Sequence, residues 1–281
     1  MMRGQVATRE MSGPGSPSSS CVTCVICGSE AAKRFSRPLY GAEVEYFQCP
    51  QCSHLTVKED EGTRVHSQEH FHAIGPRWKE RQARVLSSII RLTQLPGIRL
   101  ARVCRILDYE CGPGDLVREL NRSGFDAFGY EPCPAGPHVS ARVFSEFGVL
   151  AKKIFRFDIA TLVGVLEHTR QPDEVLDQVA SRLHSQGYLL LYAETFQEGR
   201  HNKDWHYLNP ADGHISIYSE KSLQMLMTRH DFFPILRING CIWLFRHLPK
   251  KERSFLEWGY FMASQAKIRL NLRAKSARGE Q

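Results

Sequence analysis

The chain has 281 residues, of which 42% are hydrophobic and 24% charged, values that are ordinary for a globular protein with a sizeable core. No apolar run reaches the roughly 18 residues needed to cross a bilayer. Residues 1–20 lack the apolar segment of a secretory signal, so we expect a cytoplasmic protein with no membrane partner. The net charge of +7 allows an anionic partner, although a solvated helix face explains the basic C-terminal segment more simply.

Residues 1–20 are rich in Gly, Ser and Pro, which predicts a disordered tail. Two Cys-x-x-Cys pairs follow, and they predict a zinc ribbon over 21–58 because two such knuckles supply the four thiolates of a tetrahedral site. The predicted ligands are Cys24, Cys27, Cys49 and Cys52. Cys21 competes for the first knuckle, but Gly28 supplies the turn that favours Cys24 and Cys27. The alternative is a chance cluster of buried cysteines.

A polar linker is expected over 59–78, followed by a helix from Arg77 to Leu95 in which apolar residues recur at helical spacing. The stretch 105–115 then predicts a strand ending in an acid, a tight turn at Gly112 and Gly114, and a second helix. Such a turn points backbone N–H groups at a polar ligand. An ordinary strand-to-helix connection is the competing interpretation.

Strands and helices alternate after this turn, which predicts a parallel sheet covered on both faces. Strands are expected over 127–131, 149–154, 157–163 and 187–193, and helices over 135–147 and 173–184. A loop over 194–215 leads to a helix over 219–230, capped by Ser219 and Glu220. Asn239-Gly240 predicts a hairpin between 232–237 and 241–245, and an amphipathic helix is expected over 250–273.

The order of these parts resembles the class I S-adenosylmethionine-dependent methyltransferases, in the branch with an N-terminal cysteine-rich ribbon. The likeness rests on four stretches, namely 106–114, 129–132, 157–168 and 183–189. It implies an α/β fold, with a Rossmann-like doubly wound sheet that ends in an antiparallel hairpin, plus the small zinc ribbon. The methyltransferase domain would span 79–249, with a basic helix and tail over 250–281.

The resemblance also implies the S-adenosylmethionine contacts. Residues of the glycine turn would line the methionine end, Glu131 would hold the ribose hydroxyls, and the end of the strand over 157–163 would lie beside the sulfonium. The full set of expected cofactor residues is Asp108, Glu110, Cys111, Gly112, Gly114, Glu131, Leu162 and Val163. The position of Glu131 at the end of the second strand also fits a ribose acceptor by spacing alone.

Methyl transfer to a hydroxyl or amine needs in-line approach and a base. His168 and His214 are the candidate bases, and packing or helix capping is the alternative role for each. We expect a small-molecule or sugar acceptor, shaped by the ribbon and the 195–218 loop. An RNA methyltransferase is the second hypothesis. A non-catalytic binding protein with a degenerate cofactor site is the third.

Three positions depart from the family pattern. Glu110 stands where glycine is usual, so its side chain would crowd the cofactor or impose an unfavourable backbone conformation. The stretch 152–156 offers no acid for the adenine amino group. Gly164 replaces the first acid of the Glu-x-x-Glu-His stretch through which some quinone O-methyltransferases bind a divalent cation, so that metal is not expected here.

Overall fold

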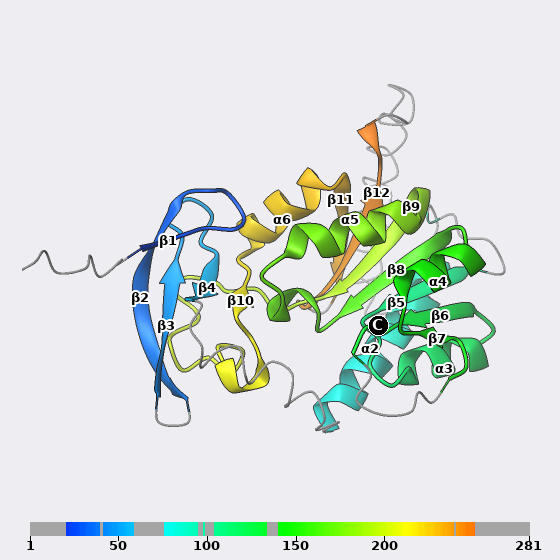
Figure 1. The fold of residues 1–281 in the computed structure, drawn as a ribbon, viewed down its shortest axis with the longest axis horizontal. Helices are drawn as coiled ribbons and strands as arrows, with labels where there is room; N and C mark the ends of the chain where they lie inside the picture. Colours follow the sequence, from blue (N-terminus) through cyan, green and yellow to red (C-terminus); the bar gives the residue numbers. More distant parts are fainter. Residues whose placement is uncertain are drawn as a thin grey trace, which may run out of the picture.

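The structure, a computed structural model, describes residues 21–39, 42–58, 76–94, 98, 104–133, 140–238 and 240–250. Within them the chain forms two β-sheets, with helices around the larger one (Figure 1). The tail predicted over 1–20, nearly all of the linker predicted over 59–78 and nearly all of the helix predicted over 250–273 lie outside these residues. No helix in the described ranges is both long enough and apolar enough to cross a membrane.

The larger sheet has seven strands in the order β11-β12-β9-β8-β5-β6-β7. Neighbours from β9 to β7 pair in parallel, whereas β12 runs antiparallel to both β9 and β11. This order confirms the predicted Rossmann-like sheet with a terminal antiparallel hairpin. The strands are β5 (Arg105–Tyr109), β6 (Asp126–Tyr130), β7 (Val143–Phe144), β8 (Phe157–Val163), β9 (Leu183–Tyr192), β11 (Phe232–Ile238) and β12 (Ile242–His247).

Helices cover both faces of this sheet (Figure 1). Successive residues of β5 point to opposite faces, so Ile106 belongs to a core shared with α2 and α3, and Leu107 to a core shared with α4, α5 and α6. Each helix buries one apolar stripe against the sheet. The helices are α2 (Pro76–Thr93), α3 (Asp115–Arg122), α4 (Phe147–Lys153), α5 (Pro172–Arg182) and α6 (Glu220–Arg229), with short 3₁₀ turns η2 (Leu166–His168) and η3 (Pro210–Asp212).

The starts of the later helices follow from local chemistry. α5 begins at Pro172, whose missing N–H would be unsatisfied in a first turn in any case. α6 begins after Ser219, whose Oγ accepts the N–H of Ser222 at 3.0 Å, while the Oγ of Ser222 accepts the N–H of Ser219 at 2.8 Å. The predicted cap is therefore right at Ser219, but its partner is Ser222 and not Glu220.

The segment between β6 and β8 was predicted wrongly. A helix was expected over 135–147 and a strand over 149–154, whereas β7 spans Val143–Phe144 and α4 spans Phe147–Lys153. Residues 134–139 lie outside the described part. Within α4 only Leu150 is fully buried, while Val149 is exposed. A short helix of seven residues is enough to bury this one position, and the apparent strand pattern of the stretch does not correspond to burial.

The smaller sheet, in the order β1-β2-β3-β4-β10, is antiparallel throughout. Its first four strands come from the ribbon, and β10 lies near the end of the 195–218 loop. Thr56 of β4 pairs with Ser216 of β10, and the N–H of Val57 donates to the carbonyl of Ile215 at 3.0 Å. The ribbon and the 195–218 loop therefore share one sheet. The strands are β1 (Cys21–Thr23), β2 (Glu30–Leu39), β3 (Ala42–Gln48), β4 (Leu55–Val57) and β10 (Ser216–Ile217).

Candidate functional site

A tight turn joins β5 to α3 at the C-terminal edge of the parallel sheet. Glu110, Gly112 and Gly114 all have positive φ angles, of 55°, 56° and 92°. Glycine is required at 114 for a second reason, because a Cβ there would lie 2.6 Å from Cγ2 of Val143. Of the two consequences expected for Glu110, the unfavourable backbone conformation is present, because its φ lies in the left-handed region.

Asp108 lies beneath this turn and is only 1% exposed. Its Oδ1 accepts a hydrogen bond from Oγ1 of Thr161 at 2.6 Å, while its buried Oδ2 has no hydrogen-bond partner among the described residues. Burial raises the pKa of Asp108 to about 7, and the nearby charge of Glu131 adds to this. A buried carboxyl oxygen without a partner is suited to a donor from a ligand, such as an ammonium group.

Glu131 follows β6 and faces the same turn. One carboxylate oxygen accepts the N–H of Gly112 at 2.8 Å and the other accepts the N–H of Cys133 at 3.0 Å. These bonds fix the carboxylate, and each oxygen keeps a lone pair that can accept a hydroxyl. The predicted ribose contact is thus placed beside the predicted methionine contacts.

The remaining residues expected to contact the cofactor lie in the glycine turn and at the end of β8. Leu162 and Val163 end β8, and both are buried. Cys111 is buried beneath Gly129, where a Cβ would lie 2.5 Å from its Sγ. Glu110 is half-buried, and burial raises its pKa to about 7, with the charges of Glu131 and Glu167 adding to the shift. The carboxyl of Glu110 therefore lies in a negatively charged part of the site.

The structure brings the two candidate bases together although they lie far apart in the sequence. The ring centroids of His168 and His214 are 5.0 Å apart. Nδ1 of His168 lies 3.0 Å from the carbonyl oxygen of Gly213, and Nδ1 of His214 lies 2.8 Å from that of Tyr207. Because a carbonyl only accepts, Nδ1 carries the hydrogen in both rings, and in the neutral rings Nε2 is the basic nitrogen.

The sequence interpretation gave no role to Glu167 and Tyr207, which complete this cluster. Tyr207 donates from its hydroxyl to Oε1 of Glu167 at 2.6 Å. One ligand atom each from Glu167, His168 and His214 lies within 4.8 Å of the others. The available signal was that Glu167 directly precedes His168, but nothing local indicated Tyr207.

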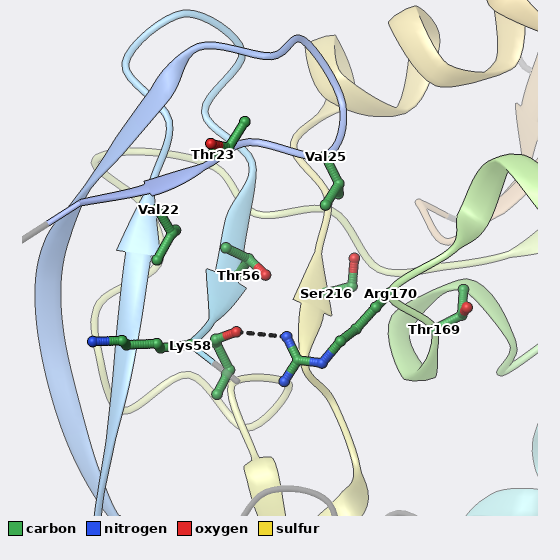
Figure 2. Close-up of a pocket in the computed structure, with 9 residues that line it drawn as sticks. Val22, Thr23, Val25, Thr56, Lys58, Thr169, Arg170 and Ser216 are labelled. Atoms are coloured by element: carbon green, nitrogen blue, oxygen red, sulfur yellow. Dashed lines mark hydrogen bonds between the residues drawn. The ribbon is translucent and has the colours of Figure 1, made fainter. Parts of the chain in front are cut away.

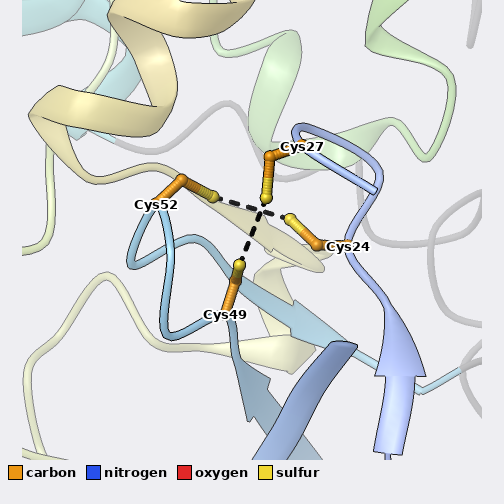
Figure 3. Close-up of side chains that lie close together, drawn as sticks. All are labelled: Cys24, Cys27, Cys49 and Cys52. Atoms are coloured by element: carbon orange, nitrogen blue, oxygen red, sulfur yellow. Dashed lines mark hydrogen bonds between the residues drawn. The ribbon is translucent and has the colours of Figure 1, made fainter. Parts of the chain in front are cut away.

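The four predicted zinc ligands converge between β1 and β4 (Figure 3). The sulfur atoms of Cys24 and Cys52 are 3.6 Å apart, those of Cys27 and Cys49 are 3.3 Å apart, and all four lie within 4.8 Å of one another. Cys21 lies in β1 outside this group.

The two knuckles have the same backbone geometry. The N–H of Gly28 bonds to the carbonyl of Cys24, and the N–H of Ser53 bonds to that of Cys49. Gly28 and Ser53 both have positive φ angles, of 74° and 56°. The turn expected at Gly28 is therefore present. The four cysteine sulfur atoms suit a metal ion that binds thiolates in tetrahedral geometry, such as zinc.

A cavity of about 390 Å³ lies where the ribbon meets the segments that follow the two histidines (Figure 2). Arg170 reaches across it and donates to the carbonyl of Val57 at 2.8 Å. The two charged residues that line the cavity, Lys58 and Arg170, are both basic. The lining residues are Val22, Thr23, Val25, Thr56, Val57, Lys58, Thr169, Arg170 and Ser216.

Comparison with known proteins gives the family. A family described as a methyltransferase domain matches residues 77–235, more than half of the chain. No curated protein matches.

Several solved structures are similar at low identity. The 1,6-didemethyltoxoflavin-N1-methyltransferase of Burkholderia thailandensis is 15% identical, with a TM-score of 0.48 over 77% of this chain and 100% of that one. A SAM-dependent methyltransferase of Methanosarcina mazei is 18% identical, with a TM-score of 0.39 over 54% and 95%. The magnesium protoporphyrin IX methyltransferase of Synechocystis is 16% identical, with a TM-score of 0.40 over 60% and 82%. Because the matching domain covers more than half of its residues, the chain belongs to the methyltransferase-domain family.

Proposed function

We propose that this enzyme transfers a methyl group from S-adenosylmethionine to a small-molecule or sugar acceptor. The observation that carries the proposal is the juxtaposition, at the C-terminal edge of one sheet, of the buried Asp108 carboxyl, the fixed Glu131 carboxylate and a pair of imidazoles. Ligands of open α/β sheets bind outside this edge.

The cofactor assignment follows the resemblance and the site geometry. The free oxygen of Asp108 suits the methionine ammonium, and Glu131 suits the ribose hydroxyls. Cys111, Gly112 and Gly114 would line the methionine end with Glu110, and Leu162 and Val163 would lie beside the sulfonium. When bound, S-adenosylmethionine supplies a methyl group on a cationic sulfur. The carboxyl groups of Asp108 and Glu110 suit that charge.

The acceptor would give up its proton to His168 or His214, each of which is held in the tautomer with a basic Nε2. The loop that carries His214 packs on ribbon residues, in a core that includes Tyr46 and Tyr207. We therefore infer that the ribbon and this loop shape the acceptor site. The basic cavity beside Arg170 favours an acceptor that carries a negative charge.

The four-cysteine cluster would hold a structural zinc ion through Cys24, Cys27, Cys49 and Cys52. All four positions are protein thiols, which leaves no open position for a substrate. The ion would join the two knuckles and so hold the ribbon against the rest of the chain.

Calorimetric titration with S-adenosylmethionine tests the proposal. We expect saturable binding by the wild type and a loss of about tenfold or more in affinity for Glu131→Gln, because a hydrogen bond to a charged group contributes about 1.5–3 kcal/mol. Glu198→Gln, on an exposed side chain, is the matched control and should bind normally.

Wild type that fails to bind at high micromolar cofactor, with binding restored by Glu110→Gly, would instead indicate a binding protein with a degenerate site. Salt-dependent RNA binding would favour the RNA methyltransferase hypothesis.

A further inference from the structure

Glu167 is a buried acid to which the proposed methyl transfer assigns no role. It is 1% exposed, and its buried Oε2 meets no hydrogen-bond partner within the part of the chain that the structure describes. Burial raises the pKa of Glu167, but the charges of His168 and His214 and the hydrogen bond from Tyr207 outweigh it and leave the pKa lowered. The side chain is therefore a carboxylate enclosed beside two imidazoles.

Tyr207 holds this group together from both ends. Its hydroxyl donates to Oε1 of Glu167 at 2.6 Å, and its carbonyl oxygen lies 2.8 Å from Nδ1 of His214. The ring of Tyr207 packs on that of His214 with 4.3 Å between centroids. The backbone adds a further link, since the N–H of Ile215 donates to the carbonyl of Glu167 at 2.9 Å.

We propose that Glu167 is the positioning residue of the acceptor base: its carboxylate stabilises the imidazolium that forms when the histidine pair takes the acceptor's proton. This rests on the proposed function. In that step the O–H or N–H bond of the acceptor breaks, and the proton moves to Nε2 of one imidazole. The electron pair stays on the acceptor atom for its new bond to the methyl carbon, while the sulfur–methyl bond would break with its electron pair on sulfur, so that neutral S-adenosylhomocysteine would be the leaving group. The carboxylate offsets the positive charge that the pair gains.

The positive charge of Arg81, next to the cluster, favours a proton site over a cation site. Arg81 of α2 lies beside Gly164, where a Cβ would be 3.4 Å from its Nη1 and 3.8 Å from Oε1 of Glu167. This guanidinium lowers the pKa of His214, as burial does first and most strongly, and it opposes a divalent ion. Glu110 lies close enough to interact with the carboxylate of Glu167, and the hydroxyl of Tyr218 donates to the carbonyl of Leu166.

The test reads imidazole pKa values by NMR titration of histidine-labelled full-length protein saturated with S-adenosylhomocysteine, so it needs no identified acceptor. We expect Glu167→Gln to lower the pKa of His168 or His214 by about one unit or more, the usual effect of losing an opposite charge at this distance. Glu174→Gln, on the exposed face of α5, should leave both unchanged. Tyr207→Phe keeps the carboxylate and should not lower either value.

Three outcomes would overturn the proposal. One is an unshifted imidazole pKa in Glu167→Gln that retains its fold by circular dichroism. Another is an equal fall in Tyr207→Phe, which would make the effect one of packing. The third is stoichiometric binding of added Mg²⁺ or Zn²⁺ at these histidines, lost in Glu167→Gln, which would make the cluster a metal site. If Glu167→Gln does not fold, Glu167→Asp replaces it and should give a smaller shift in the same direction. Failure of the wild type to bind S-adenosylmethionine is read separately and counts against the proposed function itself.

Discussion

Glu110 disfavours the folded state in two independent ways. Its left-handed backbone conformation costs a side-chain-bearing residue about 1 kcal/mol or more. Its half-buried carboxyl lies near Glu131, and the pKa of Glu110 is raised to about 7. Strain of this kind is stored at functional sites, where the surrounding structure enforces it. We infer that the negative charge is kept because the ligand of this turn is cationic.

Removing this side chain should therefore stabilise the ligand-free protein. Because the pKa of Glu110 is raised from 4.5 to about 7 in the fold, the ionised form is the unfavourable one. Its penalty is absent below pH 4.5, grows between the two values and is complete above pH 7. Urea denaturation at pH 5 and pH 8 should show Glu110→Gln gaining stability over the wild type mainly at pH 8.

Glu110→Gly should exceed Glu110→Gln by about 1 kcal/mol at both pH values, because it also relieves the backbone strain. Glu110→Ala, which keeps a Cβ but has no charge, is the control for side-chain size. A gain for Glu110→Gln that is the same at pH 5 and pH 8 would contradict the electrostatic part of the explanation.

Sequence was sufficient for the local geometry of segments whose neighbours are close in the chain or set by a repeated pattern. The two cysteine pairs and the turn from Asp108 to Gly114 are examples, because their spacing encodes their geometry. It was not sufficient for Glu167 and Tyr207, which are 40 positions apart and meet only because the long loop returns to the sheet. No pattern of either segment alone indicates that contact.

At the scale of elements, β6 is pressed against the glycine turn. A Cβ on Gly129 would lie 2.5 Å from Sγ of Cys111, 3.0 Å from Cγ2 of Val117 and 3.1 Å from Cγ2 of Val143. These neighbours come from the turn, from α3 and from β7, so one missing side chain lets three elements approach the strand. The position of the glycine turn therefore depends on a strand residue outside it.

Gly129→Ala should destabilise the protein by about 1–3 kcal/mol, the usual cost of an overpacked core. It should also weaken S-adenosylmethionine binding, because Cys111 must shift with the turn. Gly148→Ala in α4 is the matched control, since a Cβ there would meet no atom of the residues that the structure describes within 4 Å, and alanine favours a helix. Thermal denaturation and calorimetric titration of both variants measure the two effects. A Gly129→Ala protein as stable as Gly148→Ala would show that the packing is looser than described.

The elements that sequence predicted well are those with several buried positions of their own, such as β8 and α5. The failure lies at β7 and α4. β7 has two residues and is defined by pairing in parallel with β6, where Gly129 lies opposite Val143. Its existence is set by a neighbouring strand, and its own sequence carries no period that could reveal it.

The whole molecule has a core that runs from the ribbon into the methyltransferase sheet. One apolar cluster includes Ile26 and Phe47 of the ribbon together with Leu223 and Met227 of α6. Polar contacts follow the same path from α6 to the cysteine knuckles. Oγ of Ser219 donates to the carbonyl of Cys52 at 2.6 Å, and Nη1 of Arg229 donates to that of Ile26 at 2.8 Å. We therefore expect the ribbon to unfold together with the large sheet as one cooperative unit.

Zinc removal should consequently weaken the whole chain and not the ribbon alone. We expect purified protein to hold one equivalent of zinc, Cys49→Ser to lose it and Cys21→Ser to retain it, because Cys21 lies outside the cluster. In calorimetry, chelation or Cys49→Ser should lower the midpoint of a single unfolding transition. Hydrogen exchange should speed up at 214–217 as well as in the ribbon, since β10 pairs with β4.

A separate low-temperature transition, with the midpoint of the main transition unchanged, would show that the ribbon is an independent domain. In that case the rest of the chain, still folded after the ribbon has unfolded, would hold His214 beside His168 without help from the metal.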